Sequence, residues 1–369
     1  MVIHRLDEGQ TVGEVAAIYG VDEEILRRNN GLDDEDIPAV GEELLVLMPT
    51  RTYVVAKGDS IERLALRFGV LRRELSAYNP IIEREGLVPG RRLALKYGEC
   101  PYGQTVANGY FLRGGSLSLL KERLAHLTYV TVCAARCEGK RLTRIFDGRD
   151  IVGIVKMADK TPLLRIFGSG YSELSREDYD ELISAMLNMA ISGGYKGIAL
   201  GGEPPCAELM LSLRKRALGC DLILLCEVDS DSPEEICDIA DGTVFSFGAP
   251  ISEAREHRGE LCRFASARES NRCMPELCCY AECDGRLLPI KEALGIARRG
   301  GCRIEYDPER GICSFEHKKS GKFVFPSLEN IKATLEALYE YGYMGLSFDI
   351  ANIPSSFLMM ISAMFGRRQ

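Results

Sequence analysis

The feature that most constrains the fold is an alternation of strand-like and helix-like segments from residue 104 onward. Eight short apolar runs resemble buried strands, and most are separated by segments with helical periodicity, such as 175–194 and 327–342. Eight strand–helix units in about 270 residues predict an α/β fold, a (β/α)₈ TIM barrel with its active site at the carboxyl ends of the strands. The predicted strands are 104–110, 128–134, 162–168, 195–203, 220–228, 242–248, 276–282 and 343–349.

The first hundred residues contain an internal repeat with a constant offset of 49 positions. Each copy is predicted to contain a short strand, two helices and a closing strand, which makes it a small βααβ module. Thr11 and Ser60 are placed to cap the first helix, and Gly20 and Gly69 to end it. We therefore expect three domains, 1–48, 50–97 and 101–369, in which two modules precede the barrel.

Both copies resemble the LysM module along nearly their full length, because the glycine, asparagine and closing-strand positions all recur. The resemblance implies recognition of N-acetylglucosamine-containing glycans, chiefly peptidoglycan or chitin. Two linked copies would gain avidity on a repeating polymer, whereas modules that only act as spacers are the alternative. The candidate glycan-binding residues are Gly9, Thr11, Asn30, Gly58, Ser60 and Asn79.

Composition excludes several other functions. The formal net charge is −8 and no basic run is interleaved with aromatic residues, which argues against a nucleic-acid partner. We expect no cleavable signal peptide and no membrane segment, because no sufficiently long apolar run occurs. We expect no metal and no cofactor, because the histidines do not have the spacing of metal ligands. The 14 cysteines are expected to be reduced, and synthesis to be cytoplasmic.

The order of the parts resembles glycoside hydrolase family 18 enzymes of spore-forming bacteria that degrade spore-cortex peptidoglycan. The segments that carry the resemblance are "ANGYFLRGG", "LTYVTVCAARCEGKRL", "GGYKGIALGGE" and "EYGYMGLSF". The family implies a retaining N-acetylglucosaminidase in which the N-acetyl oxygen of the substrate attacks the anomeric carbon. Such an enzyme needs a general acid and a nearby aspartate that orients the N-acetyl group.

The catalytic motif of that family is incomplete in this chain. On the fourth strand the family has D-G-x-D-x-D-x-E, and the final glutamate corresponds to Glu203, the candidate general acid. The three aspartate positions hold Lys196, Ala199 and Gly201, so the assisting carboxylate is missing. The barrel is therefore expected to be weakly active, repurposed or inactive as a glycosidase.

Sugar contacts are also expected to differ from the family pattern. The chain has no tryptophan, so stacking on a sugar must come from tyrosine or phenylalanine. The family's Met-x-Tyr-Asp motif on strand six is replaced by a segment that contains Phe247, and the final tryptophan of strand eight by Asp349. The candidate substrate-binding residues are Tyr110, Phe247, Tyr280 and Glu282.

Acidic residues are predicted to gather where the strands end. Asp349 could face Glu203 across the pocket, and two close carboxylates would separate their pKa values into an acid and a base. The alternative is that these acidic residues line the open end of the barrel in contact with solvent and form no such pair. The acidic residues at predicted strand ends are Glu203, Glu227, Asp229, Glu282, Asp284 and Asp349.

From the sequence, we expect the protein to bind peptidoglycan or another N-acetylglucosamine glycan at the spore envelope or cell wall. One alternative is an active N-acetylglucosaminidase that uses Glu203 as its acid. Another is a non-catalytic assembly protein of the spore coat, whose partners are coat proteins and whose clustered thiols could crosslink.

Overall fold

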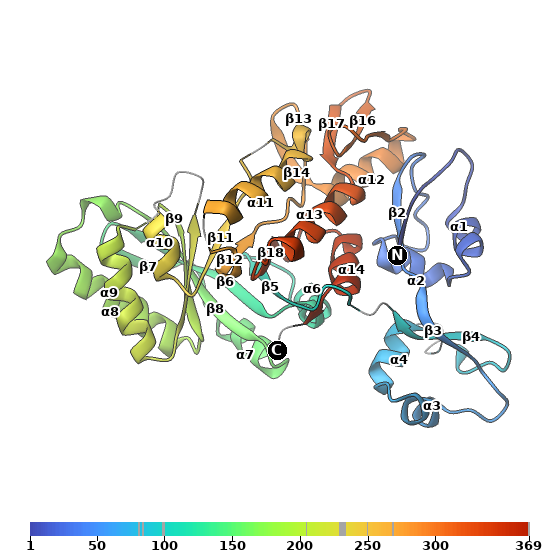
Figure 1. Cartoon of the computed structure of the whole chain (residues 1–369), viewed down its shortest axis with the longest axis horizontal. Coiled ribbons are helices and arrows are strands. Elements are labelled where there is room, and N and C mark those ends of the chain that lie inside the picture. Colours follow the sequence, from blue (N-terminus) through green and yellow to red (C-terminus); the bar gives the residue numbers. More distant parts are fainter. Residues whose placement is uncertain are drawn as a thin grey trace. The chain divides into compact units, whose positions relative to one another are not determined.

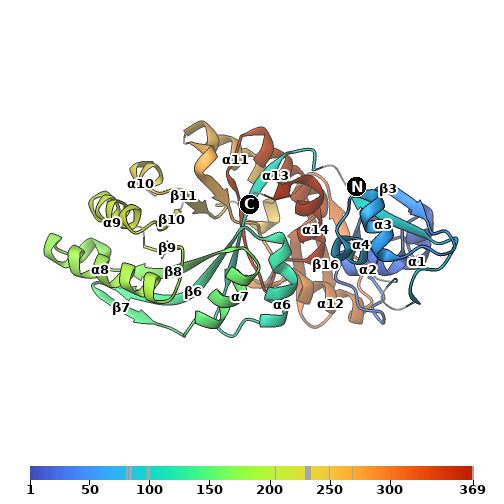
Figure 2. The same cartoon turned by 90° about the horizontal axis from the view of Figure 1, so that it is seen from below.

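The computed structural model describes residues 1–79, 82, 85–97, 100–203, 205–228, 234–248, 250–267 and 269–367 (Figures 1 and 2). The chain forms two compact units. The first comprises Met1–Gly103, Tyr280–Lys332 and Pro354–Gly366, and the second is built from Gln104–Cys279 and Ala333–Ile353. Two segments of the range predicted as the barrel domain therefore group with the N-terminal repeats.

Both repeats have the predicted strand–helix–helix–strand order. Thr11 accepts a hydrogen bond from the backbone of Glu14 at the start of α1, and Ser60 caps α3 in the same way. Gly20 and Gly69 end these helices with φ angles of 64° and 66°, a conformation that favours glycine. The elements are β1 (Val2–Arg5), α1 (Val12–Tyr19), α2 (Glu23–Asn29) and β2 (Glu43–Val46), then β3 (Pro49–Val54), α3 (Ile61–Phe68), α4 (Arg72–Tyr78) and β4 (Arg92–Tyr97).

The second unit contains a nearly closed barrel of eight parallel strands, in the order β12-β11-β10-β9-β8-β6-β5-β18. A parallel bridge between Glu276 and Ser347 links the two ends of this order. The Leu277 N–H also donates to the Ser347 carbonyl at 2.8 Å. The strands are β5 (Gln104–Phe111), β6 (Tyr129–Glu138), β8 (Thr161–Ser169), β9 (Gly197–Gly202), β10 (Ile223–Val228), β11 (Gly242–Phe245), β12 (Cys273–Pro275) and β18 (Gly345–Asp349).

The predicted seventh strand is wrong in position. The barrel strand is β12 (Cys273–Pro275), whereas Tyr280–Cys283 forms β13 in a separate antiparallel sheet. The run 276–282 is continuously apolar apart from its ends, so its pattern did not reveal that the chain leaves the barrel within it. The antiparallel sheet has the order β14-β13-β17-β16-β15. Its strands are β13 (Tyr280–Cys283), β14 (Arg286–Pro289), β15 (Glu305–Asp307), β16 (Ile312–His317) and β17 (Gly321–Pro326).

Helices follow most barrel strands, as the periodicity predicts. Ser327 caps α13 by accepting a hydrogen bond from the Asn330 N–H at 3.1 Å, and Gly342 follows that helix with φ 67°. In the described part of the chain, no helix is both long enough and apolar enough to cross a membrane. The helices are α6 (Leu117–Arg123), α7 (Arg149–Met157), α8 (Arg176–Ser192), α9 (Ala207–Gly219), α10 (Glu234–Ile239), α11 (Glu256–Ala267), α12 (Ile290–Gly300), α13 (Leu328–Glu340) and α14 (Ser355–Met364).

Candidate functional site

The barrel interior changes from apolar to polar toward the carboxyl ends of its strands. Its core contains Leu163 of β8, Leu225 of β10 and Met274 of β12. Because alternate residues of a strand face the same side, the next inward positions are Arg165, Glu227 and Glu276. A charged layer therefore covers the apolar core at the end where barrel enzymes bind their substrates.

Arg165 and Glu227 form the central ion pair of this layer. The Arg165 Nε and Nη2 atoms donate to the two carboxylate oxygens of Glu227, each at 2.6 Å. Burial opposes the charge of Arg165, but the hydrogen bonds and charge of Glu227 outweigh it and raise the pKa of the guanidinium. Such a two-point pair fixes both side chains in one geometry.

Tyr110, a predicted sugar-binding residue, lies beneath this pair. Its side chain is only 7% exposed, and the Arg165 guanidinium lies 5.3 Å from the ring centroid. Burial raises the pKa of Tyr110 well above its ordinary value, and the charges of Glu227 and Glu276 add to the effect. The ring thus packs in the barrel core with its hydroxyl directed to Glu227, a geometry unlike an open stacking surface.

Glu227 occupies the space next to Gly201, where the family pattern has an aspartate. A Cβ atom at Gly201 would lie 2.2 Å from the Glu227 Oε2 atom and 2.6 Å from its Cδ atom. These distances are well inside van der Waals contact, so a side chain at 201 and the present position of Glu227 exclude each other. A carboxylate from β10, neutralised by Arg165, thus fills the volume beside β9.

Glu203 lies at the end of β9, after a turn at Gly202 whose φ is 89°. Its N–H donates to the Gly168 carbonyl at 2.9 Å, and its carboxylate accepts a hydrogen bond from the Gly170 N–H. Glu203 therefore connects the end of β9 to the loop that follows β8.

Asp349 is nearly buried, with 6% of its surface exposed. Its carboxylate accepts hydrogen bonds from the Ala351 N–H at 2.8 Å and from Asn352 Nδ2 at 2.7 Å. β18 lies four strands from β9 in either direction around the barrel, so Asp349 and Glu203 stand on opposite strands. Both carboxylates are held by local loops, and their catalytic pairing remains a prediction.

Glu276 and Arg165 are site residues that the sequence analysis missed. The Ser246 hydroxyl donates to Glu276 at 2.9 Å. Burial raises the pKa of Glu276, and the negative charges of Glu227 and Asp349 contribute in the same direction. Arg165 interrupts the apolar run "PLLRIFG", and that interruption was the available signal. Glu276 was hidden by the misplaced seventh strand.

The other predicted residues of the barrel site are dispersed. Phe247 stacks on the ring of His257 at a centroid distance of 4.2 Å, and His257 is 4% exposed. Tyr280 and Glu282 belong to β13, which lies in the first compact unit. Asp284 follows β13 in a turn. Asp229 lies outside the described residues.

A cavity of about 370 Å³ opens beside the ion pair, at the carboxyl ends of β5, β6 and β8. Arg113, Arg136 and Arg165 line it together with Phe167, whose side chain is 40% exposed. Arginine beside an exposed ring suits a ligand that combines an anion with a flat or apolar face. Among the described residues, no cluster of histidine, cysteine, aspartate and glutamate is arranged to hold a metal ion.

The asparagines of the two repeats hold their modules together. Asn79 is 4% exposed; its Nδ2 donates to the carbonyls of Leu75 and Ala94, and its Oδ1 accepts from the Ala94 N–H. Asn30 makes the corresponding three bonds to Leu26 and Leu45. Each amide thus ties the second helix to the closing strand, and for Asn79 this burial does not fit a role in glycan contact.

The candidate loop residues of the repeats are at the surface. Gly9 and Gly58 have φ angles of 78° and 87°, and no atom lies within 4 Å of a Cβ placed on either. Thr11 is exposed and Ser60 is half-buried, and each caps the helix that follows. These four residues form the same turn in both copies.

Comparisons with known proteins agree with these elements. The LysM domain model matches residues 4–46 and 53–96, so the chain contains two LysM domains. No curated protein sequence matches the chain. The crystal structure of the spore cortex-lytic enzyme SleL from Bacillus megaterium superposes with a TM-score of 0.76 at 16% identity, over 99% of this chain and 98% of that one.

Two further crystal structures show how far the fold is shared. SleL from Bacillus cereus gives a TM-score of 0.74 at 18% identity, over 100% of this chain and 99% of that one. A chitinase from Chromobacterium violaceum gives 0.63 at 12% identity, over 70% of this chain and 98% of that one. The fold is thus shared with SleL over nearly the full length of the chain, and with the chitinase over about 70% of it.

Proposed function

We propose that the protein binds N-acetylglucosamine-containing glycan, chiefly peptidoglycan, through its LysM repeats, and that its barrel does not carry out substrate-assisted hydrolysis. The LysM match and the shared fold with cortex-lytic enzymes support peptidoglycan as the ligand. We place the protein at the spore cortex or cell wall on the same grounds. The proposal keeps the domain ranges 1–48, 50–97 and 101–369.

One observation carries the second half of the proposal. Substrate-assisted hydrolysis needs an aspartate that stabilises the positive charge developing on the N-acetyl group. Here Ala199 and Gly201 offer no carboxylate, and the space beside Gly201 is filled by Glu227. Because Glu227 is paired at both oxygens with Arg165, its charge is already neutralised. Glu203 would then have to protonate the leaving group without an aspartate that stabilises the N-acetyl group, and the acid and this aspartate act as a unit.

Co-sedimentation of the full chain with insoluble peptidoglycan tests the binding function. We expect the protein to pellet with peptidoglycan, and Glu203→Gln to pellet to the same extent, because Glu203 is not part of the repeats. Protein that stays in the supernatant would refute the proposal. That result would favour the coat assembly alternative, in which the partners are proteins and glycan is not required.

The arginine-lined cavity favours a second, non-hydrolytic role of the barrel, namely binding an acidic muropeptide. Arg113 is an exposed member of its lining and is not one of the two residues that form the Arg165–Glu227 pair. Arg113→Ala should weaken the binding of a soluble muropeptide by roughly tenfold in calorimetry. Lys215→Ala, an exposed residue of α9 outside the cavity lining, is the control that leaves the cavity intact. An unchanged affinity in Arg113→Ala would refute this role.

A further inference from the structure

The two repeats carry opposite charge although they share one pattern. Residues 1–48 contain 12 acidic and 3 basic residues, a net charge of −9, whereas residues 50–97 contain 5 acidic and 10 basic residues, a net charge of +5. At seven positions, a glutamate of the first repeat corresponds to a lysine or arginine 49 residues later in the second repeat, and these exchanges account for much of the difference. The replaced pairs are Glu8/Lys57, Glu14/Arg63, Glu23/Arg72, Glu24/Arg73, Glu35/Arg84, Glu42/Arg91 and Glu43/Arg92.

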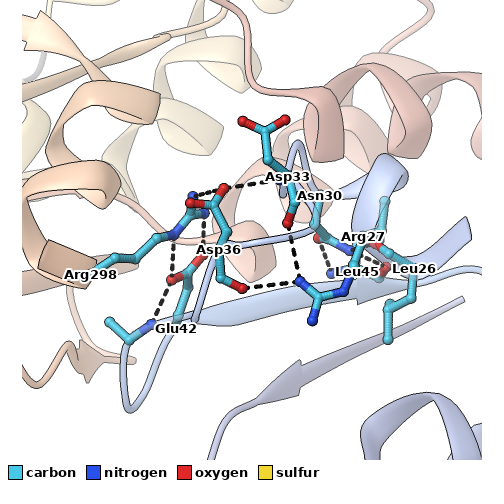
Figure 3. A network of polar contacts seen from close by, with 9 residues as sticks. Leu26, Arg27, Asn30, Asp33, Asp36, Glu42, Leu45 and Arg298 are labelled. Carbon is cyan, nitrogen blue, oxygen red and sulfur yellow. Dashed lines mark hydrogen bonds and ion pairs between the residues drawn. The ribbon is translucent and has the colours of Figure 1, made fainter. Parts of the chain in front are cut away.

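In the first repeat, some of these acidic side chains form ion pairs within the molecule (Figure 3). Glu42, whose side chain is 3% exposed, accepts hydrogen bonds from Arg298 of α12 at 2.7 and 3.1 Å. Arg298 also contacts Asp36 at 3.3 Å. Burial opposes the charge of Arg298, but Glu42 and Asp36 outweigh it and raise its pKa. This repeat is thus fastened to the segment that carries the antiparallel sheet.

Further contacts of the first repeat lie along the same surface. Glu43 binds Arg5 at 2.8 Å and accepts a hydrogen bond from the Leu328 N–H at 2.6 Å. The Arg5 guanidinium lies 3.5 Å from the ring centroid of Tyr306. Glu8, next to the exposed turn at Gly9, pairs with Arg303 at 2.8 Å.

The equivalent surface of the second repeat is open. A Cβ placed on Gly41 would lie 2.0 Å from the Ile304 carbonyl oxygen, whereas no atom lies within 4 Å of a Cβ placed on Gly90, its counterpart. Arg91, the counterpart of Glu42, pairs with Glu85 of its own repeat at 2.7 Å. Arg92, the counterpart of Glu43, is exposed.

Exposed cations lie beside half-buried aromatic rings on the second repeat. Tyr53 and Phe68 pack at a centroid distance of 5.0 Å, with the guanidinium groups of Arg51 and Arg67 5.1–5.3 Å from their rings. In the first repeat the counterparts of these arginines are Val2 and Ile18. Stacked guanidinium groups are well suited to binding carboxylates beside a sugar face.

We propose that, of the two repeats, only the second binds the glycan, that the first is a structural module fastened to the antiparallel sheet, and that the ligand is peptidoglycan with free peptide carboxylates. This inference rests on the proposed function and specifies the binding surface and the charge of the ligand. Neutral chitin lacks the carboxylates that the basic surface would bind.

A matched pair of bulky substitutions tests which repeat binds. Ala56 and Asp7 are exposed equivalents at the start of the same turn. In the full chain, Ala56→Trp should weaken co-sedimentation with peptidoglycan at least about tenfold, whereas Asp7→Trp should leave it within about twofold. Equal losses in both variants, or a loss confined to Asp7→Trp, would overturn the inference.

A charge exchange tests the same surface without adding bulk. Lys57→Glu with Arg63→Glu copies the residues of the first repeat, and the new glutamate at 63 can form a capping box with Ser60, as Glu14 does with Thr11. The fold should therefore be kept, which thermal unfolding checks. We expect at least about a tenfold loss of binding. Unchanged binding would contradict a basic binding surface.

The ligand is tested with peptidoglycan stripped of phosphate polymers by hydrofluoric acid, before and after amidation of its carboxylates. Binding should persist on the stripped polymer and fall at least about tenfold after amidation. Binding that disappears on stripping, that is unaffected by amidation, or that is equally strong on chitin would overturn the assignment. Failure of the wild-type chain to bind any of these polymers would instead refute the proposed function.

Discussion

The Glu227 carboxylate stands 2.2 Å from the position that a Cβ atom on Gly201 would take. A residue on β10 thus determines which residues β9 can accept. A side chain at position 201 would displace Glu227 from Arg165. The missing aspartate at 201 and the Arg165–Glu227 pair therefore depend on each other. The Glu227 carboxylate is thus held in an internal ion pair beside β9.

Gly201→Ala should therefore destabilise the barrel by about 1–3 kcal/mol, because the added methyl group displaces Glu227 from Arg165. Gly153→Ala in α7 is the matched control, since nothing lies within 4 Å of its Cβ position. That change should be neutral or stabilise by up to about 1 kcal/mol. Denaturant unfolding measures both, and an equal effect of the two substitutions would contradict the account.

The attachment of the first repeat predicts a second contrast. Arg298→Ala leaves Glu42 buried without its cationic partner and should cost about 3–5 kcal/mol in the free energy of unfolding. Arg303→Ala removes an exposed pair, with side chains 61% and 82% exposed, and should cost no more than about 1 kcal/mol. Denaturant unfolding of both variants distinguishes the two cases. A small effect of Arg298→Ala would mean that this ion pair does not hold the repeat in place.

Glu276 predicts a pH-dependent effect. Its folded-state pKa is raised, mainly by burial, so the folded protein binds this proton more tightly than the unfolded chain does. Stability from this group is present at low pH and lost as the pH rises through the raised pKa. Glu276→Gln should therefore raise the melting temperature at about pH 7.5 and change it little at about pH 4. An equal shift at both pH values would count against this assignment.

The buried amide of Asn79 predicts a structural phenotype. Asn79→Ala removes three hydrogen bonds and leaves the Ala94 backbone groups without partners from this side chain. We expect a loss of about 2–4 kcal/mol and rapid tryptic cleavage within the second repeat. Lys96 is an exposed residue of β4, the strand that contains Ala94. Lys96→Ala should therefore leave cleavage unchanged, apart from the loss of the site at Lys96 itself. Slow cleavage of Asn79→Ala would show that the amide is not needed for the module.

Local patterns predicted much of this structure. The repeats followed from an exact offset and from helix caps such as Thr11 and Gly20, whose effects depend only on near neighbours in the chain. Seven barrel strands were located because each apolar run is bounded by turns or helices. The seventh strand was misplaced because "ELCCYAE" has no internal break, although the chain leaves the barrel within it.

The candidate site was less predictable because it depends on contacts between distant strands. The family resemblance implied that aspartates are missing at 199 and 201, but not that Glu227 fills the space or that Arg165 neutralises it. Likewise, the repeat pattern could not show that Glu42 meets Arg298, a residue 256 positions away. Whether an acidic residue binds a ligand or a guanidinium is decided by packing that periodicity does not encode.

The most direct test of the central claim is to measure new reducing ends in the same tube in which the full chain is bound to cortex peptidoglycan. The account predicts that the protein pellets with the polymer while reducing ends stay at the level of a protein-free control, for both the wild-type chain and Glu203→Gln. Release of reducing ends by the wild-type chain that disappears in Glu203→Gln would contradict it and would establish Glu203 as a working general acid.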